Sequence, residues 1–267
     1  TDHPHYYRGA QGDETEADFG IRVARELEAK IDELGEDKVA AFIAEPITGA
    51  SGVIVPPAGY YEKVQAILNK YDILFWADEV ITGFGRTGKV FGCETVNIQE
   101  PDQMTFAKQL SSAYYPISAA VIRGDIYEAM RQPSAEVGVF GHGYTYSGHP
   151  VACAAALKTL EIYERENLYA NAADVGAYLQ SRLAGLREHE RNDSLGNDGR
   201  RGHGADVGSL LESRRGFLAL HINRRKWPAE GGNGLHGGPH HKRCTVGHAA
   251  LKPTRAIGAA VVALLLV

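Results

Sequence analysis

The sequence predicts an α/β protein with a mainly parallel sheet and helices on both of its faces. Two observations support this prediction. Short apolar runs recur between residues 39 and 122, as expected for buried strands. Segments with the three- and four-residue spacing of amphipathic helices alternate with these runs, and this alternation is typical of parallel sheets.

The first expected element is an amphipathic helix that ends before Gly35 and has Asp13 or Thr15 near its start. Its apolar side chains recur every three or four residues, at Phe19, Val23, Leu27, Ile31 and Leu34. A buried strand follows over residues 39–44, and two prolines at 56–57 then open a second helix.

Further apolar runs predict strands over residues 73–77, 104–107 and 117–122. Ligands of such sheets bind beyond the carboxyl ends of the strands. Glu45, Asp78 and Lys108 each come just past a predicted strand end, so we expect these three side chains at one edge of the sheet.

Composition changes near residue 190. Residues 1–189 carry 16 Lys+Arg and 27 Asp+Glu, whereas residues 190–267 carry 12 and 6 with little sustained periodicity. Three interpretations compete for this later segment: a basic nucleic-acid-binding arm, a metal site, and a frame-shifted, disordered tail. The metal site would use His236, His240, His241, Cys244 and His248. We favour the frame-shifted tail, because the arm lacks interleaved aromatics and the His/Cys cluster lacks a second paired ligand module.

Two features concern the cellular compartment. Cys93, Cys153 and Cys244 form no CxxC pair, which favours a reducing, cytoplasmic setting over a disulfide framework. The long apolar run at residues 256–267 is shorter than the roughly 20 residues that a membrane-spanning helix needs. We therefore expect no membrane role.

Lys108 and Asp78 form the most informative pair of residues. Because Lys108 ends an apolar run, its amine is expected to be desolvated, which lowers the pKa of a lysine and leaves it nucleophilic. A carboxylate that faces the amine across the sheet suits a Schiff-base cofactor. The lysine would bind the aldehyde and the aspartate would bind the protonated pyridine nitrogen.

A glycine-rich stretch at residues 83–88 formally matches GxGxxG and nearly matches a P-loop. No helical pattern follows it, and Val90 replaces the Ser or Thr that binds Mg²⁺ in a P-loop. We therefore interpret the stretch as a closely packed loop. Arg86 within it is expected to pack against this loop rather than to bind an anion.

Three blocks of sequence together resemble the class III aminotransferases, and most closely their ω-amine:pyruvate group. The blocks are ADEVITGFGRTG at 77–88, AKQLSS at 107–112 and HGYTYSGHP at 142–150. The resemblance covers about residues 1–189. It implies part of a fold-type-I (aspartate-aminotransferase-like) large domain over 1–150 and helices over 151–189 that lead toward a small C-terminal domain. Residues 190–267 lie outside it.

The resemblance implies a pyridoxal 5'-phosphate cofactor and assigns its contacts to four residues. Lys108 is the Schiff-base lysine and moves the substrate proton, while Asp78 keeps the pyridine nitrogen protonated. Val80 packs on one face of the ring. Thr145 binds the cofactor phosphate of the partner subunit, which implies a homodimer. Glu45 matches a family position near the substrate.

The implied reaction transfers an amino group from an amine or ω-amino acid to a keto acid, with pyruvate expected. The family's phosphate-binding turn, its ring-stacking aromatic residue and its substrate-carboxylate arginine are not recognisable in this sequence. We therefore expect the chain to be inactive alone. An inactive fragment that serves as an interaction surface is the first alternative, and a nucleic-acid binder with a basic tail is the second.

Overall fold

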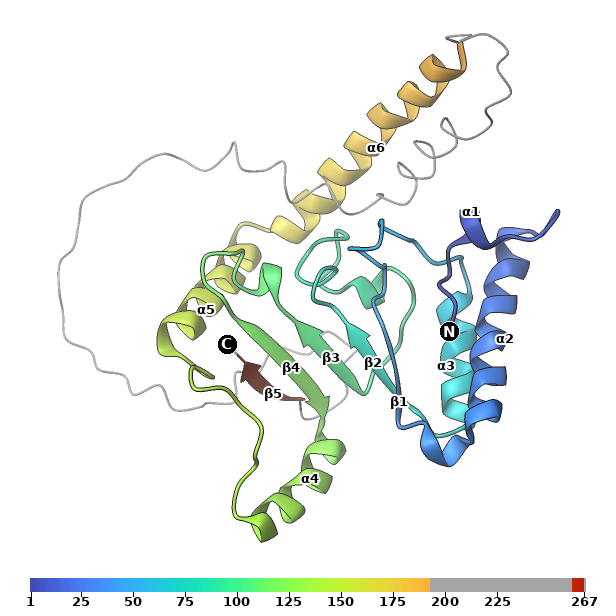
Figure 1. Cartoon of the computed structure of the whole chain (residues 1–267). Coiled ribbons are helices and arrows are strands. Elements are labelled where there is room, and N and C mark those ends of the chain that lie inside the picture. The colour runs from blue at the N-terminus through green and yellow to red at the C-terminus, as the bar shows by residue number, and fades with distance from the viewer. Residues whose placement is uncertain (193–260, 267) are drawn as a thin grey trace, which may run out of the picture.

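The computed structural model describes residues 1–192 and 261–266 of the chain. At its centre lies a sheet with strand order β1-β2-β3-β4-β5 (Figure 1). The strands are β1 (Ala41–Ala44), β2 (Leu74–Asp78), β3 (Gln103–Phe106), β4 (Ser118–Arg123) and β5 (Val261–Leu266). Strands β1, β2 and β3 are parallel, whereas β4 is antiparallel to β3 and β5 is antiparallel to β4.

The α/β class is confirmed, and all four strands predicted between residues 39 and 122 are present. We expected a mainly parallel sheet without assigning the direction of each strand, and β4 is antiparallel. Only residues 107–117 connect β3 to β4, and a parallel crossover needs a dozen or more residues, usually with a helix. Strand β5 was not expected either, since we interpreted residues 256–267 as part of a tail without a fold.

The predicted first helix is confirmed as α2 (Glu16–Leu34). Thr15 caps it by accepting a hydrogen bond from the Asp18 backbone N–H at 3.2 Å, which satisfies one of the free donors of the first turn. Gly35 follows the helix with φ of +91°, a conformation that glycine adopts without a steric penalty. The second predicted helix is α3 (Tyr60–Lys70), which packs beside α2 (Figure 1).

Residues 151–189, which we expected to be helical, lie within two helices, α5 (Pro150–Arg165) and α6 (Leu168–Asn192). The helical conformation is interrupted between them at Asn167, whose φ is +50°. Two helices were not predicted, α1 (Tyr6–Gly9) and α4 (Gly124–Val137). Three short 3₁₀ helices complete the described structure: η1 (Glu36–Lys38), η2 (Gly92–Glu94) and η3 (Lys108–Leu110).

The core lies on one face of the sheet. Buried side chains of α2, α3 and α5 form a single hydrophobic cluster with the strand residues on this face, including Phe75, Ala77, Met104, Phe106 and Val121. On the opposite face Ile43 is 55% exposed and Leu74 is 36% exposed. Among the described residues, therefore, helices bury one face well and leave the second partly open. No described helix is long and apolar enough to cross a membrane.

Candidate active site

The predicted site residues lie where the ends of β2, β3 and β4 meet. Asp78 is the last residue of β2 and pairs with Thr105 of β3, and Lys108 follows three residues after Thr105. Because β4 is antiparallel to β3, it begins at this same edge of the sheet. The sheet therefore brings Asp78 and Lys108 to one edge, together with the loop that precedes β4.

The carboxylate of Asp78 is held through one of its two oxygens. Oδ1 accepts hydrogen bonds from the Val80 backbone N–H at 3.0 Å and from the Thr105 hydroxyl at 3.3 Å. Oδ2 accepts no hydrogen bond from any residue that the structure describes. Asp78 is half-buried, so this second oxygen is available to a ligand with a proton to donate.

Lys108 begins the short helix η3 with φ of +41°, a left-handed conformation that is uncommon for a residue with a side chain. Contacts of the two residues that follow Lys108 hold this strained segment. The side chain of Leu110 is buried in the core, and the Tyr163 hydroxyl of α5 donates a hydrogen bond to the Gln109 carbonyl at 3.0 Å. Lys108 itself is exposed, so the described residues do not provide the desolvation that we expected.

Glu79 follows Asp78 directly, and the alternation of side chains along β2 sends it into the core. It is 1% exposed. Its carboxylate accepts hydrogen bonds from the Thr82 hydroxyl at 2.5 Å and from the backbone N–H groups of Gly92 and Cys93 at 2.9 and 2.7 Å. Burial raises the pKa of Glu79 from its usual 4.5, and the hydrogen bonds oppose that shift. Glu79 thus anchors the glycine-rich loop at the end of β2.

Glu45 and Arg86 both serve local packing in the described structure. The Glu45 carboxylate accepts a hydrogen bond from the Gly49 backbone N–H at 2.9 Å, which closes the turn after β1. Arg86 is 8% exposed, and its Nε donates to the Ile81 carbonyl at 3.4 Å. Burial lowers the pKa of this guanidinium. These contacts agree with the loop-packing role that we expected for Arg86.

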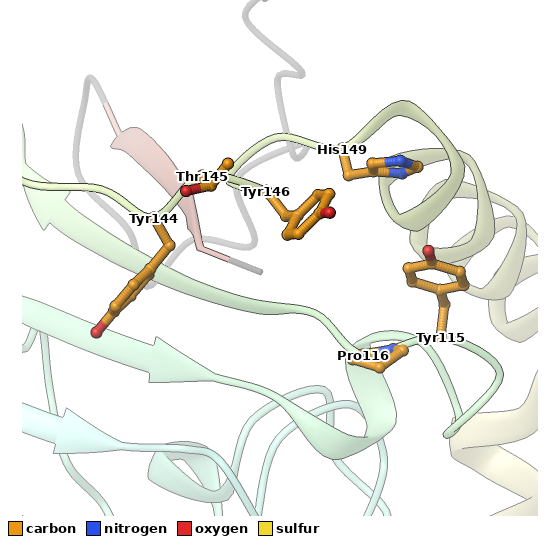
Figure 2. Close-up of a pocket in the computed structure, with 6 residues that line it drawn as sticks. All are labelled: Tyr115, Pro116, Tyr144, Thr145, Tyr146 and His149. Atoms are coloured by element: carbon orange, nitrogen blue, oxygen red, sulfur yellow. The ribbon is translucent and has the colours of Figure 1, made fainter.

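Thr145 belongs to the segment that leads into α5. It lines an open pocket of about 680 Å³ between the loop that precedes β4 and the segment that leads into α5. The lining residues are Tyr115, Pro116, Tyr144, Thr145, Tyr146 and His149. Figure 2 shows Thr145 and Tyr146 across this pocket from Tyr115 and Pro116. The rings of Tyr115 and His149 stack at a centroid distance of 5.9 Å. Neither Asp78 nor Lys108 lines this pocket.

Three residues near the site were not predicted from the sequence to contribute to it: Trp76, Thr105 and Glu79. The two-residue period of a strand puts Trp76 on the same face as Asp78 and puts Glu79 on the other. The period was visible in the sequence, but the pairing that places Thr105 beside Asp78 was not. The proposed metal site and basic arm lie outside the described residues. Within the described residues no group of three or more His, Cys, Asp or Glu side chains is placed to hold a metal ion.

Comparison with protein families identifies a match over residues 3–203 to the family model described as aminotransferase class-III. The chain is 52% identical over 180 residues to an uncharacterised aminotransferase of Sinorhizobium fredii, covering 67% of the chain and 38% of that protein. It is 55% identical over 168 residues to the chloroplastic gamma aminobutyrate transaminase 3 of Solanum lycopersicum, covering 63% and 32%. A diaminobutyrate–2-oxoglutarate transaminase of Halomonas elongata is 48% identical over 192 residues, covering 71% and 41%. The chain thus spans about two fifths or less of these relatives.

Solved structures of transaminases match the described fold. A transaminase determined with L-alanine gives a TM-score of 0.68 at 52% identity, covering 70% of this chain and 44% of that one. The omega transaminase of Pseudomonas jessenii in complex with PMP gives a TM-score of 0.68 at 50% identity, covering 72% and 41%. These matches confirm the expected fold class, part of a fold-type-I large domain.

Proposed function

Because the chain belongs to the class III aminotransferases, we propose that it binds pyridoxal 5'-phosphate and transfers amino groups from an amine or ω-amino acid to a keto acid. The observation that carries the proposal is the arrangement at the ends of β2 and β3. An aspartate oxygen without a partner among the described residues and an exposed lysine lie at the ends of adjacent strands. A pyridinium cofactor with an aldehyde needs these two groups.

The residues present fit the cofactor. Oδ2 of Asp78 is an acceptor for a protonated ring nitrogen, and the half-buried Val80, whose N–H binds the other oxygen of Asp78, would supply an apolar contact for the ring. The exposed amine of Lys108 is accessible to the aldehyde. When bound, pyridoxal phosphate supplies an electron-accepting ring that stabilises the carbanion left after a substrate loses its α-proton.

The chain's own residues would then perform two tasks. Asp78 holds a proton on the ring nitrogen, since a nearby carboxylate favours the charged form of its partner. The Lys108 amine would act as the general base that accepts the α-proton of the substrate, and its protonated form would act as the acid that gives the proton back. The left-handed backbone of Lys108 directs this amine, and the contacts of Leu110 and Tyr163 keep the backbone in place.

Pyruvate is the keto acid that we propose as acceptor. The matched transaminase with L-alanine supports this choice, because L-alanine is the amino form of pyruvate. The Halomonas relative is named for 2-oxoglutarate instead, so an acceptor assay should compare both keto acids. The cytoplasmic setting stays a prediction, since some relatives are named chloroplastic or mitochondrial.

The proposal is tested by trapping the cofactor on the chain. The full chain is mixed with pyridoxal phosphate, reduced with borohydride and analysed by peptide mass mapping. We expect a mass increase of one reduced cofactor on the peptide that contains Lys108, and its loss in Lys108→Ala. Lys89→Ala is the matched control, because Lys89 is an exposed lysine of the nearby glycine-rich loop and should not affect labelling. An unlabelled Lys108 in the wild-type chain would contradict the proposal.

We further propose that Thr145 binds the phosphate of the cofactor held by a partner subunit. Thr145 is exposed, and the pocket that it lines does not include Asp78 or Lys108. Its neighbours Tyr144 and Tyr146 are 66% and 68% exposed, and a second copy of the chain would cover them. A hydroxyl in a glycine-flanked turn suits a phosphate oxygen.

Mixing two variants tests this assignment across subunits. A Lys108→Ala chain and a Thr145→Ala chain each lack one part of the site, but a hybrid dimer contains one complete site if Thr145 acts on the partner. We expect tight cofactor labelling to return when the two variants are refolded together. Labelling that stays as weak in the mixture as in either variant alone would contradict the assignment.

The alternative is a catalytically inactive fragment. The exposed apolar side chains of Ile43 and Leu74 on the second face of the sheet favour it, because such a face can bind another protein. Cofactor trapping distinguishes the two hypotheses, since we expect no label on Lys108 in an inactive fragment.

A further inference from the structure

Two side chains outside the predicted site connect to Asp78 in a line across the sheet. The indole N–H of Trp76 donates a hydrogen bond to the Thr105 hydroxyl at 3.3 Å. The Thr105 hydroxyl lies 3.3 Å from Oδ1 of Asp78. Trp76 and Asp78 are two residues apart in β2 and share one face, and Thr105 is the residue of β3 that pairs with Asp78.

The chemistry of the three groups fixes the direction of this line. The indole N–H can only donate a hydrogen bond, and an ionised carboxylate can only accept one. The Thr105 hydroxyl has a single proton, so it accepts from Trp76 and donates to Asp78. Reversing either bond would leave two acceptors or two donors facing each other.

This line of hydrogen bonds restrains a side chain that would otherwise rotate. The outer torsion of an aspartate is broad, so an aspartate with a single contact can turn its carboxylate plane. Here Oδ1 is held from two directions, by the Thr105 hydroxyl and by the Val80 backbone N–H. Oδ2 is then left at a defined position on the side of the site.

We propose that Trp76 and Thr105 are positioning residues for Asp78. They occupy Oδ1 so that Oδ2 is the fixed acceptor for a protonated heteroaromatic nitrogen. The identity of that nitrogen rests on the proposed function, whereas the line of hydrogen bonds does not. A side chain that restrains a reacting group from behind acts by pre-organisation, and its loss weakens ligand binding without removing a ligand contact.

The first arm of the test needs no cofactor. The full chain is labelled with ¹⁵N in the indole of tryptophan, which gives one signal each for Trp76 and Trp227. Trp76→Phe assigns the signals. We then measure how much Asp78→Asn changes the chemical shift of the Trp76 indole N–H. The measurement is made in the chain with threonine at position 105 and in the Thr105→Val and Thr105→Ser variants.

We expect the Asp78→Asn shift to be transmitted with threonine or serine at position 105 and to disappear with valine, because only a hydroxyl connects the two groups. Gln103→Ala is the matched control, since Gln103 pairs with Trp76 from the same strand as Thr105 and on the same face. This background should leave the shift intact. An Asp78→Asn shift of the same size in the valine background overturns the proposal.

The second arm measures affinity for pyridoxal phosphate. Losing one hydrogen bond that orients Asp78 should weaken binding roughly 2- to 10-fold in Thr105→Val, and Thr105→Ser should restore it. Unchanged affinity in Thr105→Val overturns the positioning role even if the hydrogen bonds exist. A wild-type chain that does not bind the cofactor overturns the proposed function instead, and the first arm alone then decides whether the line of hydrogen bonds restrains Asp78.

Discussion

Glu79→Gln tests whether the buried carboxylate stabilises the fold through its hydrogen bonds or destabilises it through its charge. Two opposing effects have to be compared. Burial raises the pKa of Glu79, because desolvation penalises its ionised form. Against this, the carboxylate accepts three hydrogen bonds from donors that have no access to water.

The geometry sets the size of each effect. Glutamine keeps one acceptor oxygen. When this oxygen takes the place of Oε2, it still accepts the hydrogen bonds from Thr82 and Gly92. The new amide group then faces the Cys93 backbone N–H, and a buried donor without an acceptor costs about 1–3 kcal/mol. The two remaining bonds lose their charge assistance, which makes them about half as strong. Relief of desolvation offsets part of this loss, and we expect a net destabilisation of about 2–3 kcal/mol.

Urea unfolding of the full chain, followed by far-UV circular dichroism, measures this change. Glu94→Gln is the matched control: Glu94 belongs to the same loop and accepts one backbone hydrogen bond, from Phe91 at 3.0 Å, but it is exposed. Its replacement should cost less than about 0.5 kcal/mol, as usual for the surface. A Glu79→Gln chain as stable as the wild type would refute the reasoning. The free-energy cost of burying the charge would then be as large as the stabilisation that the hydrogen bonds provide.

Two further predictions concern the same loop. Gly92→Ala should destabilise the chain by about 1–3 kcal/mol in the same urea assay, because its Cβ would lie 2.5 Å from the buried Cβ of Thr82. Gly141→Ala, which would meet no atom within 4 Å, is its control, and equal stabilities would contradict the prediction. Burial raises the pKa of the Cys93 thiol above 9.0, so above this pH the unfolded chain releases a proton that the folded chain keeps. The contribution of this thiol to the free energy of unfolding should therefore be fully present below pH 9.0 and be lost as the pH rises. In Cys93→Ala the free energy of unfolding should fall less over this pH range, and an identical pH profile for both chains would exclude the thiol as a cause.

The sequence contains most of the information that defines the described fold. The helix α2 was predictable from its Thr15 cap, its apolar spacing and Gly35. The helix α4 was not, because it buries no residue and contains Pro133, so neither periodicity nor composition marks it. The strand β4 was identified from its apolar run, but a run of apolar residues carries no information on strand direction.

The candidate site was predictable in part for a related reason. Asp78 and Lys108 could be placed at one edge because each follows a strand, and the ends of parallel strands meet there. The exposure of Lys108 could not be foreseen, since it depends on what covers the sheet rather than on the strand before it. The contact of Thr105 with Asp78 depends on strand register, which the local pattern of either strand does not determine.

Adjacent acidic residues with opposite surroundings have a practical consequence for protein engineering. Asp78 and Glu79 are neighbours, yet one faces the site and the other is sealed in the core. In a library randomised at this dipeptide, two different selections would therefore report on the two positions. Survival of heating would report on Glu79, whereas the visible colour of retained cofactor would report on Asp78. A pooled screen for activity alone would merge losses of binding with losses of folding, so both positions should be varied singly.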